Sequence, residues 1–131
     1  MSPRMFAEFI FPYQLEISRR FGRVYYGCCE PLHDRWDTIK AIENLRTLSV
    51  SPWCNMPKLA QVIPPTVNVA CKPNPAYIAQ GFEKELLEAH AKEAHDAFPH
   101  NAIEYVMKDV HTIESDVSRI TRWIDIARSC V

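Results

Sequence analysis

Four short apolar segments, each followed by a helical pattern, recur along this chain of 131 residues. Strands that alternate with helices predict parallel pairing, because a crossover helix returns the chain to the same end of the sheet. We therefore expect an α/β fold: a mostly parallel sheet built as an N-terminal helix followed by four βα units. The expected strands are Val24–Cys29, Leu45–Val50, Val67–Cys71 and Asn101–Val110.

Proline, asparagine and acidic residues mark the expected helix starts. The opening helix is expected to start at Pro12 and to carry Tyr13, Ile17 and Phe21 on its apolar face. Gly22 then ends it. Later helices are expected to begin at Pro31, at Asn55, at Gly81 and after Asp116.

The last of these helices shows apolar residues at helical spacing. Val117 and Ile120 are followed by Trp123 or Ile124 on the same expected face. We found no internal repeat, low-complexity segment or linker, so residues 1–131 are expected to form a single domain.

The composition is that of an ordinary globular chain, with 47% hydrophobic and 24% charged residues. A net charge of −1 provides no basic surface for nucleic acid. Apolar runs such as Phe9–Phe11 are far too short to cross a bilayer. Five cysteines without framework spacing, and no basic leader before an apolar run, favour a reducing, cytoplasmic location.

Polar and sulfur-bearing side chains follow every expected strand. In parallel α/β folds the carboxyl ends of the strands form the ligand-binding rim, so we expect a site there. The expected catalytic residues are Glu30, Asp109 and His111, the expected substrate-binding residues are Trp53, Lys72 and Asn74, and the expected metal ligands are Cys28 and His111.

Two of these groups depend on strand alternation. Asp109 and His111 are two residues apart, so on a continuing strand they face the same way, and a carboxylate orients an imidazole. The alternative is that Asp109 simply bonds the backbone of a turn. Cys28 and Cys29 are adjacent, so one sulfur is expected inside and the other among the helices, where inert packing is the alternative.

The remaining rim residues suit ligand binding. Lys72 and Asn74 lie in a segment stiffened by prolines, and preorganised loops favour binding. Trp53 has the ring needed to stack on a planar ligand, and Lys108 has the reach to contact an anion. Packing between loops, a rigid connection and a solvated lysine are the alternative explanations.

Three segments carry a resemblance to a known family: Tyr25–Pro31 (YYGCCEP), Asn68–Pro75, and Lys108–Thr112 continuing to Arg122-Trp123. From about Phe9 onward the chain resembles the C-terminal half of a barrel of the uroporphyrinogen decarboxylase-like superfamily, which includes corrinoid-dependent methyltransferases. The resemblance implies half of a TIM-type barrel, (βα)4.

The methyltransferase branch of that superfamily holds zinc through a His-x-Cys pair and a later Cys. Cys28 matches the Cys of the pair, but Tyr26 stands where the His is expected. The later Cys falls near Lys108, where His111 or Cys71 is the available substitute. The resemblance thus implies zinc, and a corrinoid carried by a partner protein.

The function expected from this resemblance is that of a corrinoid-linked methyltransferase-like protein. One alternative is a non-catalytic remnant or accessory half-barrel that acts by association, and another is metal-free chemistry on a small carboxylated substrate with Lys72, Asp109 and His111. The decarboxylase residues that handle substrate carboxylates belong to the other half of the barrel. Open sheet edges predict a homodimer or a missing N-terminal half-barrel as partner.

Overall fold

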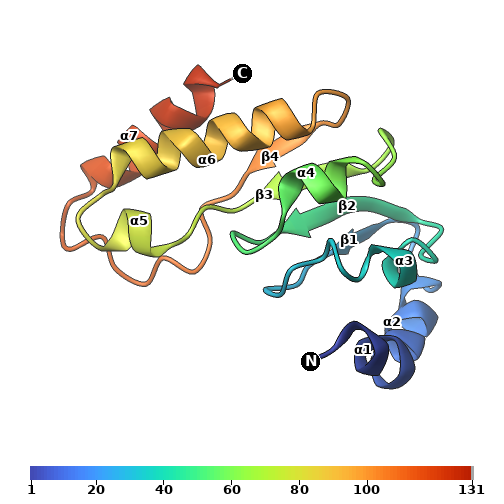
Figure 1. The fold of residues 1–131 in the computed structure, drawn as a ribbon. Coiled ribbons are helices and arrows are strands. Elements are labelled where there is room, and N and C mark those ends of the chain that lie inside the picture. Colours follow the sequence, from blue (N-terminus) through green and yellow to red (C-terminus); the bar gives the residue numbers. More distant parts are fainter. Residues whose placement is uncertain (131) are drawn as a thin grey trace.

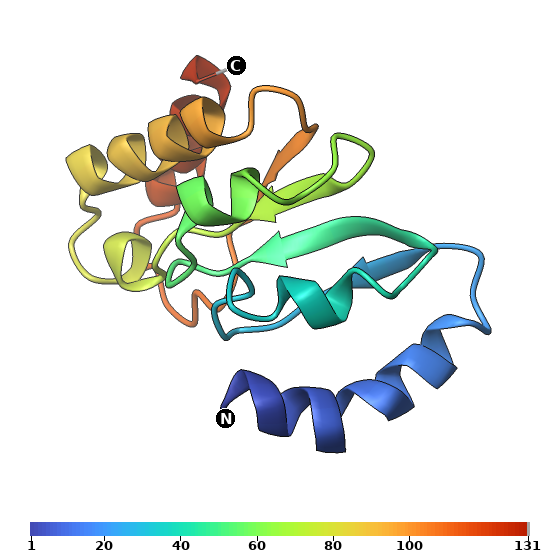
Figure 2. The same cartoon turned by 45° about the vertical axis from the view of Figure 1, so that its right-hand side comes forward.

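The computed structural model of the chain describes residues 1–130 and contains one four-stranded sheet. The strands lie in sequence order, β1-β2-β3-β4, and each neighbouring pair is parallel (Figures 1 and 2). This confirms the α/β class, the parallel sheet and the (βα)4 order. The strands are β1 (Val24–Tyr26), β2 (Leu45–Val50), β3 (Asn68–Cys71) and β4 (Ile103–Tyr105).

Helices precede and follow every strand. They are α1 (Pro3–Phe9), α2 (Phe11–Ser18), α3 (Trp36–Ile39), α4 (Met56–Ala60), α5 (Ala76–Ala79), α6 (Lys84–Ala97) and α7 (Ser118–Ser129). In Figure 2, α1 and α2 lie at the β1 end of the sheet, and α7 lies at the β4 end, beside α6, which also contacts α4. No helix in residues 1–130 combines the length and apolar content needed to span a membrane.

The two faces of the sheet differ in chemistry. Tyr26, Leu48, Val69 and Ile103 are aligned across the four strands and pack in the apolar core. Because side chains alternate along a strand, the residues between them point to the opposite face. On β2 that face carries Thr47 and continues to Ser49, so it is polar.

Side-chain caps fix two of the helix starts. The Oδ1 atom of Asn55 accepts a hydrogen bond from the backbone N–H of Lys58 at 2.8 Å, which confirms the predicted cap of α4. The Oγ atom of Ser2 accepts from the N–H of Met5 at 3.3 Å and caps α1, a helix that the sequence did not predict.

The expected strands β1 and β4 are shorter than predicted. They end at Tyr26 and Tyr105, so the expected continuations through Cys29 and Val110 are wrong. β4 ends at Tyr105 because its partner β3 ends opposite it at Cys71, two residues before a proline. β1 ends at Tyr26 although β2 continues to Val50. The alternation arguments for Cys28–Cys29 and for Asp109–His111 therefore fail, and Asp109 has a positive φ of 60°.

The predicted apolar face of the opening helix is wrong, and that of α7 is right only in part, at Trp123, Ala127 and Cys130. In the opening helix Tyr13, Ile17 and Phe21 are exposed, while Phe6 and Phe11 are buried. The helical segment is apolar on both sides, and periodicity does not tell which side meets the core.

In α7, Trp123 is buried with Ile126, whereas Val117, Ile120 and Ile124 are exposed. The predicted helix from Gly81 starts only at Lys84, because Gly81 and Phe82 both have positive φ. A short helix, α5, precedes this turn.

Candidate functional site

A cavity of about 140 Å³ lies at the carboxyl ends of β2 and β3, beside the segment that follows β4. It brings together four of the predicted site residues, Trp53, Lys72, Asn74 and Asp109. Cys28, Glu30 and His111 are not among its lining residues. The remaining lining residues are Cys29, Ser51, Pro52, Pro73, Pro75 and Lys108.

Two lysines and the Asp109 carboxylate carry the charges of this cavity. Lys72 is 5% exposed, and burial together with the neighbouring Lys108 ammonium lowers its pKa. The Nζ atom of Lys108 lies 3.7 Å from the Asp109 carboxylate and 3.6 Å from Cys29 Sγ. The Asp109 carboxylate is the main cause that raises the pKa of Lys108. Lys108 thus stays charged while Lys72 is the more readily deprotonated amine.

Ser51 adds a buried polar atom without a partner. Its side chain is 1% exposed, and its Oγ atom has no hydrogen-bond partner among the described residues. An unsatisfied buried hydroxyl costs about 1–3 kcal/mol, so a ligand atom that bonds it is favoured. Ser51 was not predicted from the sequence, although Thr47, Ser49 and Ser51 alternate along β2 and the residue that follows it.

Two further predicted residues sit at the edge of the cavity. Asn74 uses its Oδ1 atom to accept a hydrogen bond from the N–H of Ala76 at 3.0 Å, which holds the turn into α5. Trp53 is largely exposed and borders the cavity with its ring. Asn74 therefore shapes the loop, whereas Trp53 is placed to cover a ligand.

Glu30 and Cys28 belong to a different cluster. The buried Arg35 pairs with the Glu30 carboxylate and donates a hydrogen bond to the Met1 carbonyl at 2.9 Å. Its guanidinium also lies 4.7 Å from the centroid of the Phe6 ring and 3.9 Å from Cys28 Sγ. These contacts fasten α1 to the loop after β1, which gives both predicted residues a structural role here.

His111 is exposed in the segment between β4 and α7. Within residues 1–130 no hydrogen bond or ion pair joins it to Asp109 or Cys28, and no group of three or more His, Cys, Asp or Glu side chains is placed to hold a metal ion. The zinc ligand set that the resemblance implies therefore stays a prediction.

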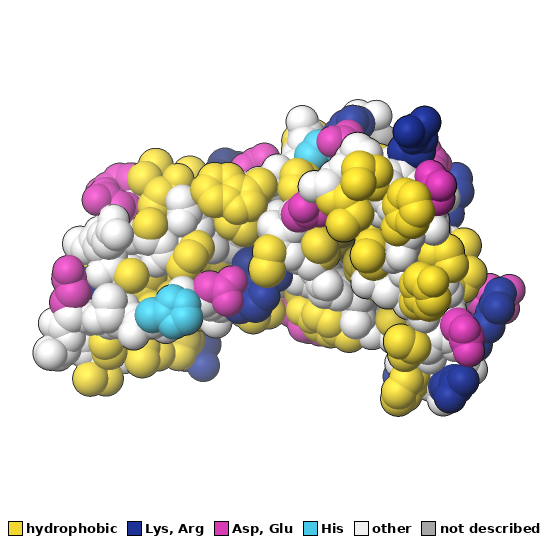
Figure 3. All heavy atoms as spheres, turned by 90° about the horizontal axis from the view of Figure 1, so that it is seen from below, with side chains coloured by type: hydrophobic (Ala, Val, Ile, Leu, Met, Phe, Trp, Pro, Cys, Tyr) yellow, Lys and Arg dark blue, Asp and Glu magenta, His cyan; other side chains and the backbone are white. Residues whose placement is uncertain are grey.

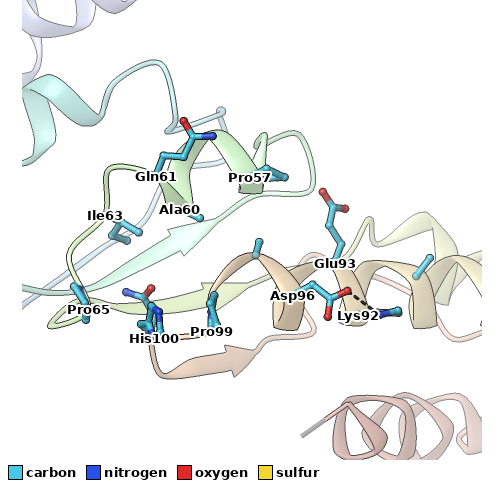
Figure 4. A pocket seen from close by; sticks show the side chains of 13 residues that line it. Pro57, Ala60, Gln61, Ile63, Pro65, Lys92, Glu93, Asp96, Pro99 and His100 are labelled. Atoms are coloured by element: carbon cyan, nitrogen blue, oxygen red, sulfur yellow. Dashed lines mark hydrogen bonds and ion pairs between the residues drawn. The ribbon is translucent and has the colours of Figure 1, made fainter.

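A larger cavity, of about 750 Å³, opens between α4 and α6 (Figure 4). It lies near the turns that precede β3 and β4, at the end of the strands opposite to the smaller cavity. Lys92 and Asp96 on its wall are paired with each other at 2.7 Å. The gap follows from the short α4, with five residues, beside α6, with fourteen. Since α/β ligands bind at the carboxyl ends of strands, the smaller cavity is the candidate site.

Comparisons of the chain with protein-family models, with curated proteins and with solved structures gave no match.

Proposed function

We propose that this chain is a uroporphyrinogen decarboxylase-like half-barrel that binds the carboxylate group of a small molecule. The binding site is the cavity at the carboxyl ends of β2 and β3, which we call the mouth. The observation that carries the proposal is the meeting of buried Lys72 and buried Ser51 with the Lys108 ammonium in one cavity. Buried amines and hydroxyls without full partners favour a ligand that supplies oxygen acceptors.

Each group has a distinct part in such binding. Lys108 provides the permanent charge, and Ser51 donates its hydroxyl hydrogen to a carboxylate oxygen. Lys72 adds a second charge when it is protonated. The volume of about 140 Å³ equals roughly five water molecules at ~30 Å³ each, which suits a carboxyl group and one or two attached carbons.

Calorimetric titration with acetate, propionate and succinate tests this proposal. We expect saturable binding that Lys108→Met weakens by about three- to fivefold, since a partly exposed ion pair contributes on the order of 1 kcal/mol or less. Lys40→Met is the matched control, because Lys40 is exposed and pairs with Asp37 on α3. Binding should also strengthen as the pH falls through the lowered pKa of Lys72, because its protonation adds positive charge. Equal binding by both variants, or no saturable binding, contradicts the proposal.

Methyl transfer at a thiol is the second candidate. The contact between Cys29 Sγ and the Lys108 ammonium, at 3.6 Å, favours it because an ammonium attracts a negatively charged sulfur. A corrinoid would be delivered by a partner protein, as the resemblance implies, and zinc would need ligands beyond those described. Alkylation by methyl iodide, followed by peptide mass analysis, should label Cys29 faster than half-buried Cys130. The labelling of Cys29 should be slower in Lys108→Met than in the wild type. Equal labelling rates contradict this candidate.

The remaining alternative is an accessory half-barrel that acts by association without turnover. Carboxylate binding at the mouth distinguishes the two, because an associating remnant has no need of the Lys72–Ser51 cavity. Elemental analysis gives a separate readout. Stoichiometric zinc that is lost on Cys28→Ala favours the methyltransferase relation, and ordered, metal-free protein favours carboxylate binding or association.

A further inference from the structure

A stripe of large apolar side chains runs along the outside of α1 and α2. Met5, Phe9, Tyr13, Ile17 and Phe21 follow one another at intervals of four residues and are 48–69% exposed. Figure 3 shows hydrophobic side chains gathered at the end of the molecule where these helices lie. We call these five residues the N-terminal stripe.

The N-terminal stripe is a second apolar face of α1 and α2, in addition to the apolar face that packs on the core. Phe6 and Phe11, on the other side of the same helices, are buried and pack with each other at a ring-centroid distance of 5.8 Å. A helical segment that is apolar on both sides is typical of a helix that is buried on both sides. In the single chain one of those sides has nothing packed on it.

The opposite end of the sheet has the same property. α7 buries Trp123 and Ile126, yet Val117, Ile120 and Ile124 on its outer side are exposed. We call these three residues the C-terminal stripe. The N-terminal stripe lies at the β1 edge of the sheet and the C-terminal stripe at the β4 edge. At each edge the helices are buried on the side that faces the core and exposed on the other side.

We propose that the occupant of both stripes is a second copy of this chain. A two-fold axis parallel to the strands places the N-terminal stripe of each copy against the C-terminal stripe of the other. One operation thus covers all four stripes, as a closed two-fold interface requires. The strands of both copies then run the same way, so the two mouths open at the same end.

The available area matches a stable dimer. Side chains of this size present about 150–250 Å² when free, so at their observed exposures each of the eight contributes on the order of 100 Å². The sum is roughly 800 Å² per copy, the usual size of a specific interface. Exposed apolar patches on monomers seldom exceed a few hundred Å².

Each chain has five helical segments for its four strands when α1 is counted with α2 and α5 with α6. A closed eight-stranded barrel has one helix per strand. At each junction both the opening helices of one copy and α7 of the other are therefore present, and they pack on each other through the stripes. The interface is consequently built by helices, whatever the distance between the strand edges.

Sedimentation of the full-length chain from micromolar to millimolar concentration tests the proposal. We expect a dimer, and we expect Tyr13→Lys and Val117→Lys each to raise its Kd by about thirtyfold or more, as for central interface residues. Val62→Lys is the matched control, since Val62 is also more than half exposed but lies on neither stripe. Far-UV circular dichroism verifies that every variant is folded.

The second substitution makes the arrangement falsifiable. A dimer weakened by Tyr13→Lys but not by Val117→Lys overturns the pairing of unlike stripes. A folded wild-type monomer at all concentrations overturns the second copy as occupant and assigns the stripes to an unlike half-barrel. Carboxylate titration of the Tyr13→Lys monomer separates this test from that of the mouth, because the Lys72–Ser51 cavity lies within one chain.

Discussion

The helices at the centre of the sheet and those at its two ends treat their apolar residues differently. In α3, α4 and α6 the large apolar side chains Ile39, Leu59 and Leu87 are fully buried. At the ends, α1, α2 and α7 each bury one side and expose another. A central helix has the sheet beneath it and neighbours on both flanks, whereas an end helix has a neighbour on one flank only.

This difference shows that a helix can carry more apolar surface than its own domain buries. The helical pattern of Tyr13 and Ile17 is as regular as that of Phe11 and Leu15, yet only the latter side meets the core. The central helix α6 exposes one large apolar side chain, Leu86, whereas the end helices expose continuous stripes of them, and this larger surplus is what motivates an inter-chain contact at the ends.

The largest expected effect concerns adjacent leucines on α6. Leu87 is 0% exposed and packs with Trp123 and Ile126, so Leu87→Ala should lower the free energy of unfolding by about 2–5 kcal/mol. Leu86 is 45% exposed, and Leu86→Ala should cost less than about 0.5 kcal/mol. Urea denaturation measures both. Similar costs for the two leucines would mean that α6 is not buried as described.

A central position should also control the acid stability. Burial lowers the pKa of His90 from 6.5 to about 4. Below pH 6.5 the unfolded chain binds a proton at His90, whereas the folded chain binds it only near pH 4. The stability is therefore full above pH 6.5 and falls as the pH drops from 6.5 to about 4. The total loss is about 3 kcal/mol at ~1.4 kcal/mol per pH unit.

Replacement of His90 tests this directly. His90→Gln should flatten the unfolding free energy between pH 6.5 and pH 4, while His95→Gln, at an exposed position of the same helix, should leave the slope unchanged. Urea midpoints across that range provide the measurement. An unchanged slope in His90→Gln would show that another group causes the acid sensitivity.

The smallest effect compares caps at the centre and at the end. Asn55→Ala removes the cap of α4, which packs against α6, and should cost about 1 kcal/mol. Ser2→Ala removes the longer cap bond of α1, at 3.3 Å, and should cost about 0.5 kcal/mol or less. Thermal unfolding of the two variants ranks them. A larger loss from Ser2→Ala would reverse the comparison between centre and ends.

Much of the fold was predictable because it depends on local patterns. The bounds of β2, the Asn55 cap and the alternation of strands with helices all follow from neighbouring residues. The length of β4 did not, because β4 ends where the hydrogen-bonding edge of its partner β3 ends, at Cys71 opposite Tyr105. In the candidate site, Lys72 and Trp53 were predicted from their places after strands, whereas Ser51 was not predicted.

By itself the sequence determined the order of elements, the parallel sheet and the rim that collects polar residues, since these depend on periodicity and crossover geometry. Tertiary structure alone decided which side of each end helix faces the core, that Glu30 pairs with Arg35, and that Ser51 lies buried beside Lys72. The reason is physical: periodicity specifies that a helix has an apolar face, but burial depends on what lies opposite that face.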